Sequence, residues 1–155
     1  MPDITGCFLC ELIRHLAEPP QAGGEQLYLK EFDLLKQFPA LRGDLGEMDF
    51  LPRGSVNLAQ CWIGPARART GLHYDPLDNR AVQISGTKRF LLARPGTVER
   101  AGALSTKYDS WARLSRVGIA ELAAGGGGAA ADDFFAVDLE PGDVLYVPAH
   151  WWHEL

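Results

Sequence analysis

Three residues of this chain, His73, Asp75 and His153, have the types and the spacing of a metal site. His73 and Asp75 are two positions apart, so on a β-strand their side chains point to the same face. A second histidine from a distant strand would complete a set of two imidazoles and one carboxylate. Such a facial triad holds iron(II) on one side of an octahedron and leaves the other positions open for a cosubstrate and oxygen. The pattern therefore predicts an iron site.

The His-X-Asp tripeptide is weak evidence alone, because Asp75-Pro76 is also a common way to begin a turn. His153 strengthens the metal interpretation. It follows Trp151 and Trp152, and aromatic side chains tend to bury and to draw the backbone inward with them. His150 is a competing ligand candidate that ranks second, because it lies closer to the end of the preceding predicted strand.

Lys88 follows His73 by fifteen residues, on a predicted strand. A lysine at the edge of a sheet is usually solvated. A lysine inside a barrel would instead supply a fixed cation for a carboxylate ligand. Thr70 and Asn79 could add neutral hydrogen bonds to the same ligand.

Composition limits the class of protein. The chain has 155 residues, 46% of them hydrophobic and 23% charged, which is ordinary for one globular domain. The net charge of −5 disfavours a protein that holds nucleic acid mainly through its phosphates. A local basic patch is expected around Arg67, Arg69, Lys88 and Arg89.

Cysteine usage and hydropathy bear on location. Three cysteines without a regular framework favour a reducing compartment. No apolar run is long enough to span a bilayer, and the N-terminus lacks the basic segment and cleavage site of a signal peptide. We therefore expect an intracellular protein, cytoplasmic or nuclear. Cys7 and Cys10 resemble half of a zinc or redox motif, but we expect both to be buried on the apolar face of a helix.

Hydrophobic periodicity outlines the elements that must position these residues. An amphipathic helix is expected at 3–17, a short strand at 26–30 and a helix at 32–42 that breaks at Pro39. Further strands are expected at 55–63, 79–85, 88–93, 134–139 and 143–148.

The connections between these strands are also predicted. Gly86-Thr87 favours a hairpin between 79–85 and 88–93, and a turn is expected at 140–142. Residues 110–123 suggest a helix, and 125–131 a flexible Gly/Ala loop without phosphate-binding context. Short strands with turn signals predict a mainly β barrel or sandwich with flanking helices. We expect one domain, with 1–50 as support and 51–155 as the barrel core.

Two long runs carry a family resemblance. Residues 62–96 contain WxGP, LHxDPxxN and QxxGxK, and residues 139–155 contain PGDxLYxPxxWWH, in that order. Together they closely resemble the JmjC-domain oxygenases, and most of all their small cupin-like hydroxylase branch. The resemblance reaches back to Tyr28 and has a gap across roughly 97–132.

The resemblance implies a double-stranded β-helix of the jelly-roll or cupin-like kind. It implies that His73, Asp75 and His153 ligate Fe(II), and that Lys88 pairs with the far carboxylate of 2-oxoglutarate. Tyr28, Thr70 and Asn79 would add hydrogen bonds to this cosubstrate, and Trp62 would line the pocket.

The implied activity is that of a dioxygenase using 2-oxoglutarate and oxygen, with a protein or peptide as its substrate. The outcome would be hydroxylation of a side chain or demethylation of N-methyl-lysine. Nucleic acid is a less favoured partner, and a homodimer is left open. Members of the family normally continue past the second histidine, so the last strand or strands are expected to be absent here. The alternative is therefore a non-catalytic cupin-like binding module.

Overall fold

The computed structural model describes residues 4–17, 27–45, 59–108, 113–125 and 128–155. The chain divides into two compact units, Met1–Ala68 and Arg69–Leu155, and each is described by itself. The single domain with a boundary after residue 50 stays a prediction. Within the described residues, no helix is long and apolar enough to cross a membrane.

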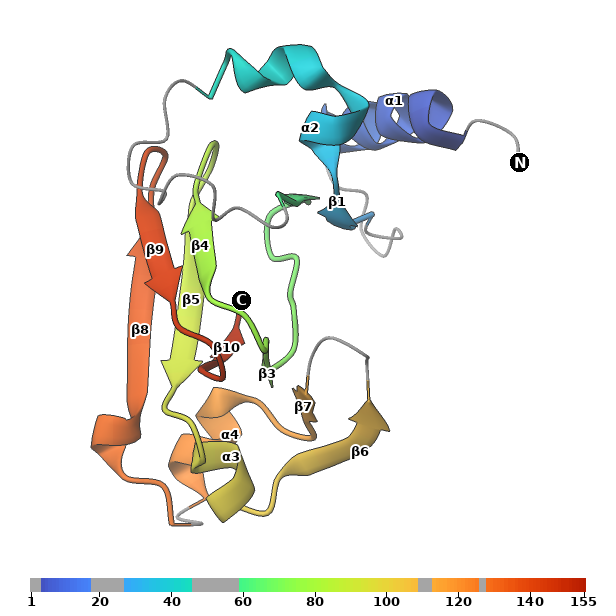
Figure 1. The fold of residues 1–155 in the computed structure, drawn as a ribbon. Coiled ribbons are helices and arrows are strands. Elements are labelled where there is room, and N and C mark those ends of the chain that lie inside the picture. The colour runs from blue at the N-terminus through green and yellow to red at the C-terminus, as the bar shows by residue number, and fades with distance from the viewer. Residues whose placement is uncertain (1–3, 18–26, 46–58, 109–112, 126–127) are drawn as a thin grey trace. The chain divides into compact units, whose positions relative to one another are not determined.

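The described residues of the first unit form two helices, a 3-10 turn and a small antiparallel pair of strands (Figure 1). They are α1 (Ile4–Ala17), β1 (Leu29–Phe32), α2 (Leu34–Gln37), η1 (Pro39–Arg42) and β2 (Cys61–Ile63). The helix at 3–17 and the break at Pro39 are confirmed. The predicted burial of Cys10 is wrong, because its side chain is exposed while Leu12 is buried on the same helix. Among the described side chains of α1, residues 10–17, burial is therefore more restricted than the apolar sequence suggests. The side chain of Cys7 lies outside the described residues.

The second unit is mainly β and antiparallel. Its elements are β3 (His73–Tyr74), β4 (Asn79–Val82), β5 (Lys88–Ala93), α3 (Thr97–Arg100), β6 (Leu104–Tyr108), β7 (Arg113–Ser115), α4 (Ile119–Ala124), η2 (Ala131–Asp133), β8 (Phe134–Leu139), β9 (Val144–Val147) and β10 (Trp152–Glu154). Six strands form a sheet in the order β6-β7-β3-β10-β5-β8, and β4 pairs with β9 in a second sheet (Figure 1).

The chain passes repeatedly between these two sheets. It runs from β3 to β4 and back to β5, and later from β8 to β9 and back to β10. This winding is that of a double-stranded β-helix, as the family resemblance implies. The predicted hairpin between 79–85 and 88–93 is wrong, because β4 pairs with β9 while β5 pairs with β8 and β10. Gly86-Thr87 thus connects β4 of one sheet to β5 of the other sheet. A hairpin turn would instead have paired β4 and β5 with each other.

The structure also corrects the prediction for the segment after β5. Of the helix predicted at 110–123, residues 119–123 are helical, as part of α4 (Ile119–Ala124), and residues 110–112 lie outside the described part of the chain. Residues 113–115 form β7, which pairs with β3 beside His73. Strand pairing therefore overrides the helical preference of these residues. Residues 126–127 of the predicted loop at 125–131 lie outside the described part of the chain, and Ala131 is the first residue of η2.

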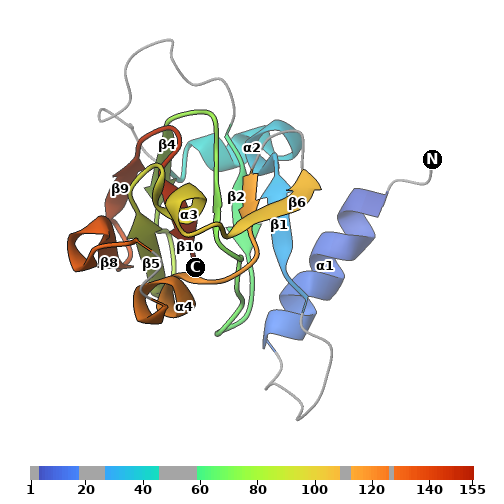
Figure 2. The same ribbon diagram turned by 90° about the horizontal axis from the view of Figure 1, so that it is seen from below.

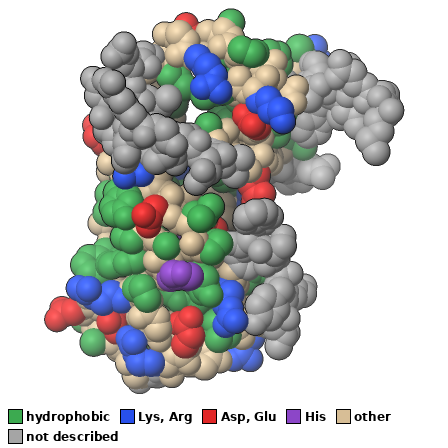
Figure 3. All heavy atoms as spheres, viewed as in Figure 1, with side chains coloured by type: hydrophobic (Ala, Val, Ile, Leu, Met, Phe, Trp, Pro, Cys, Tyr) green, Lys and Arg blue, Asp and Glu red, His purple; other side chains and the backbone are tan. Residues whose placement is uncertain are grey.

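Side chains on one face of each sheet fill the space between the two sheets. Along β5, Phe90 and Leu92 point inward, and they pack with Leu139 of β8 and Val147 of β9. These four residues are at most 6% exposed, and their burial holds the sheets together. The outward face of β4 and β9 is more exposed, and hydrophobic side chains gather on the face of the molecule seen in Figure 3.

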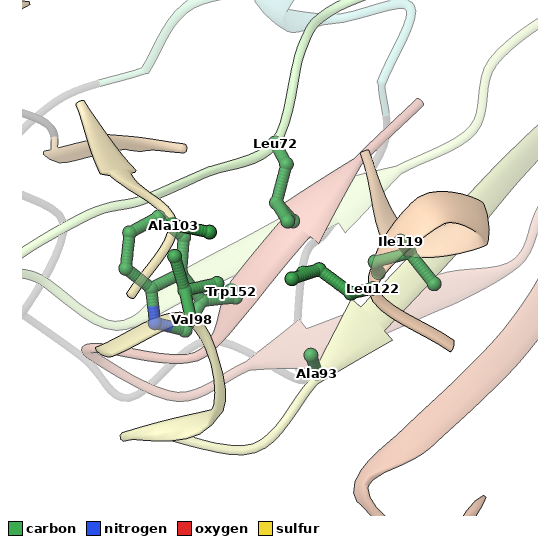
Figure 4. Close-up of a cluster of buried hydrophobic side chains, with 7 residues drawn as sticks. All are labelled: Leu72, Ala93, Val98, Ala103, Ile119, Leu122 and Trp152. Carbon is green, nitrogen blue, oxygen red and sulfur yellow. The ribbon is translucent and has the colours of Figure 1, made fainter. Parts of the chain in front are cut away.

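A second core lies on the other face of the six-stranded sheet. Trp152 is its largest member, and residues of β5, α3 and α4 surround it (Figure 4). The helices α3 and α4 lie together at one end of this unit, toward the viewer in Figure 2. Because Trp152 and His153 are consecutive in β10, their side chains point to opposite faces. Anchoring Trp152 in this core therefore turns His153 toward the space between the sheets.

Replacing Trp152 with alanine should lower the free energy of unfolding by about 3–5 kcal/mol. The side chain is 0% exposed, and its indole Nε1 donates to Glu99 Oε2 at 3.2 Å. Chemical denaturation would measure the change. Trp62→Ala is the matched control, since Trp62 is 43% exposed and should cost much less. Equal losses in the two variants would contradict this account of the core.

Candidate metal centre

The three predicted ligands meet in the second unit. The ligand atoms of His73, Asp75 and His153 all lie within 4.8 Å of one another. His73 and His153 are directly opposed in the β3–β10 pair, with ring centroids 4.2 Å apart. His153 Nε2 lies 3.8 Å from Asp75 Oδ2. Two nitrogens and one oxygen thus converge as a facial set of ligands requires.

Backbone carbonyls orient both imidazoles. His73 Nδ1 lies 2.8 Å from the carbonyl oxygen of Gly71, and His153 Nδ1 lies 3.1 Å from that of Trp151. A carbonyl can only accept, so these contacts favour the tautomer with its hydrogen on Nδ1, which leaves the Nε2 lone pair for a metal. In both cases the carbonyl belongs to the residue two positions earlier. Sequence reasoning missed these partners because any residue type can supply a backbone carbonyl.

Asn79 orients the carboxylate. Its Nδ2 donates to Asp75 Oδ2 at 2.6 Å. We predicted that Asn79 would bond to a cosubstrate, and the structure shows it on a metal ligand. The contact leaves the amide oxygen of Asn79 for another partner, so the predicted role toward 2-oxoglutarate stays a prediction. The spacing Asp-Pro-X-X-Asn was the signal that could have revealed this contact.

Burial and charge favour a neutral His153. The residue is only 6% exposed, and this burial lowers the pKa of His153 below its ordinary value. The neighbouring His73 lowers it further, while the carbonyl of Trp151 and the charge of Asp75 act in the opposite direction. The imidazole is therefore neutral at neutral pH, which is the form that binds a metal.

His150, the second-ranked ligand candidate, is not part of this cluster. Among the described residues, the metal-binding group consists of His73, Asp75 and His153 alone. The exposed His150 instead packs its ring against Tyr74, with centroids 5.3 Å apart. Tyr74 lies between His73 and Asp75 in the chain and points to the opposite face of β3 from His73.

His150→Ala should therefore keep iron affinity within a few-fold of wild type. Its imidazole contributes no ligand atom to the cluster, and only its ring contact with Tyr74 would be lost. Titration with Fe(II) under anaerobic conditions would measure this. A loss of binding comparable to that of His73→Ala would show that His150 enters the metal site.

Two further residues fit an anionic ligand beside the metal. Lys88 is half-buried on β5 and points to the same face as Leu92, which is directly opposite His153. Among the described residues, no hydrogen-bond or ion-pair partner of the Lys88 amino group is found. Thr70 Oγ1 is buried and likewise lacks a hydrogen-bond partner there. A buried hydroxyl without a partner costs free energy, so a bound polar ligand would be stabilised at this point.

The remaining two predicted residues belong to the other unit. Tyr28 is half-buried beside Gly64, where an added Cβ would lie 2.5 Å from the Tyr28 ring. Glycine at 64 thus lets this ring lie against the backbone. Trp62 of β2 is 43% exposed. Their predicted roles toward 2-oxoglutarate and the pocket stay predictions.

Comparison with known proteins agrees with this geometry. The sequence model of a family described as "Cupin-like domain" matches residues 9–155. Jumonji C domain-containing protein 5 of Drosophila melanogaster is 33% identical over 143 residues, which cover 88% of this chain and 35% of the relative. Human tRNA wybutosine-synthesizing protein 5 is 29% identical over 123 residues, covering 79% of this chain and 38% of the relative.

One plant relative is named as a demethylase. Lysine-specific demethylase JMJ30 of Arabidopsis thaliana is 29% identical over 134 residues, which cover 83% of this chain and 30% of the relative. The chain thus spans about a third of the length of these relatives.

Proposed function

We propose that this chain, which belongs to the cupin-like JmjC domain family, is an Fe(II)- and 2-oxoglutarate-dependent dioxygenase that hydroxylates a protein side chain. One observation carries the proposal: two imidazole nitrogens and one carboxylate oxygen converge within 4.8 Å. Bound iron with this cosubstrate would supply the oxidising power to insert oxygen into a C–H bond. Demethylation of N-methyl-lysine uses the same chemistry and is the variant that the names of the plant relatives support.

Different residues of the chain would hold the metal and 2-oxoglutarate. His73, Asp75 and His153 would hold the metal through Nε2 atoms and a carboxylate oxygen. Lys88 would pair with the far carboxylate of 2-oxoglutarate, and a charge-assisted bond of this kind is strong where water is excluded. Thr70 would satisfy its buried hydroxyl on the same cosubstrate. The protein thus fixes positions and excludes water, while the bound groups carry the oxidation.

The substrate is proposed to be a protein or peptide. The net charge of −5 gives little attraction to a phosphate backbone. Because some relatives are named for tRNA wybutosine synthesis, RNA is the alternative substrate that the experiment must distinguish from a protein. An intracellular location, cytoplasmic or nuclear, and a homodimer both stay predictions.

Succinate release is the test. The chain would be loaded anaerobically with Fe(II) and 2-oxoglutarate, exposed to oxygen, and offered peptide libraries or tRNA in parallel. Succinate formation that peptides stimulate supports the proposal, and stimulation by tRNA alone would move the substrate to RNA. Binding of metal and 2-oxoglutarate without any succinate would favour the non-catalytic binding module.

A further inference from the structure

Two segments next to the metal ligands are joined by hydrogen bonds. One is the loop of residues 75–78, which links β3 to β4 and begins at the ligand Asp75, and the other is the turn of residues 148–151, which precedes β10 and its ligand His153. The β4–β9 ladder would join them, but its last pair is Asn79 with Val147. The next residue on that side is Pro148, which has no N–H to donate. The ladder therefore stops one step before the turn.

A side chain continues the connection past this proline. The N–H of Ala149 donates to Asp78 Oδ1 at 2.8 Å, and the N–H of His150 donates to the carbonyl oxygen of Asp75 at 2.9 Å. The loop that begins at Asp75 thus accepts hydrogen bonds from two successive backbone amides of the turn that precedes His153.

The turn needs such support because its backbone is unusual. Trp151 N–H donates to the Pro148 carbonyl at 3.2 Å, and this closes a four-residue turn. His150, the third residue of that turn, has a φ of 67°, in the left-handed region that favours glycine or asparagine. The same turn sets the direction of Trp151, whose carbonyl orients the His153 imidazole.

We propose that Asp78 is a positioning residue. Its carboxylate holds the 148–151 turn through the hydrogen bond from the Ala149 N–H, and the turn thereby places His153 next to His73 and Asp75 in the metal-free protein. The inference rests on the proposed function for its consequence, since a preplaced set of ligands binds iron more tightly. Asp78 contributes no ligand atom to the metal group. Its effect is therefore exerted through the turn.

Metal titration tests the consequence. Fe(II), or Co(II) as a redox-stable probe, would be titrated anaerobically into wild type, Asp78→Ala and Asp78→Asn. Asp78→Ala should bind about tenfold more weakly or worse, as is typical when a residue that supports a metal ligand is removed. Asp78→Asn should remain near wild type, because its amide oxygen can still accept from Ala149. Asp138→Ala is the matched control, since Asp138 is an exposed carboxylate paired with Arg89 on the outward face of β8.

Amide hydrogen exchange in the metal-free protein tests whether Asp78 holds the 148–151 turn. The amides of Ala149 and His150 should exchange faster in Asp78→Ala and at the wild-type rate in Asp138→Ala. Wild-type metal affinity in Asp78→Ala would overturn the proposal. Equal weakening in Asp78→Asn would also overturn it, because the effect would then come from charge alone. A wild-type chain that binds neither metal would contradict the proposed function, while exchange would still decide whether Asp78 holds the turn.

Discussion

Replacing His153 with alanine should abolish measurable iron binding while the chain still folds. His153 supplies one of three ligand atoms that lie within 4.8 Å of one another. Removing a partner that merely supports a ligand costs about 10- to 100-fold in affinity, so loss of a ligand itself should exceed about 100-fold. The cost to folding should be ordinary for a buried side chain, roughly 1–3 kcal/mol.

Thermal unfolding with and without Fe(II) would measure this effect independently of turnover. A metal at 100 times its dissociation constant stabilises the wild-type protein by about 2.7 kcal/mol. For a chain of this length that corresponds to a rise in Tm of roughly 5–10 °C. His153→Ala should show no rise, whereas the exposed His15→Ala on α1 should show the full one. A full rise in His153→Ala would remove the metal assignment.

The convergence of His73, Asp75 and His153 was predictable from the sequence because two simple rules lead to it. Alternation along a strand puts His73 and Asp75 on one face, and the aromatic surroundings of His153 indicate that its segment is buried. The contacts that prepare these ligands were not predictable. The bond from Asn79 to Asp75 and the carbonyls of Gly71 and Trp151 depend on how the backbone turns. A list of residue types contains no such information.

The fold shows the same division between local and tertiary information. Period-two patterns located β5 and β8 correctly, because strand alternation is local. They could not identify strand partners, so the hairpin expected around Gly86-Thr87 proved to be a crossing between sheets. The strand β7 was missed because three residues carry too little periodicity, and it exists through its pairing with β3 and β6.

Lys88→Ala should weaken 2-oxoglutarate binding by roughly 30-fold or more and leave iron binding within a few-fold of wild type. The ammonium group lies on the inward face of β5, four residues before Leu92, the partner of His153. Four residues of strand correspond to about 13 Å, which a lysine side chain and a dicarboxylate can bridge together. Truncating one member of a desolvated charge pair costs about 2–5 kcal/mol, and each 1.4 kcal/mol is about tenfold in affinity.

Calorimetric titration of the metal-loaded protein with 2-oxoglutarate, without oxygen, would separate the two effects. Arg89→Ala is the matched control, because Arg89 is the next residue of β5 and points to the opposite, solvent-exposed face. Its loss should leave 2-oxoglutarate affinity unchanged. Lys88→Arg should retain part of the affinity, since it keeps the charge but alters the geometry of the donors. If Lys88→Ala and Arg89→Ala both bind 2-oxoglutarate like wild type, the cation that holds the cosubstrate lies elsewhere in the chain.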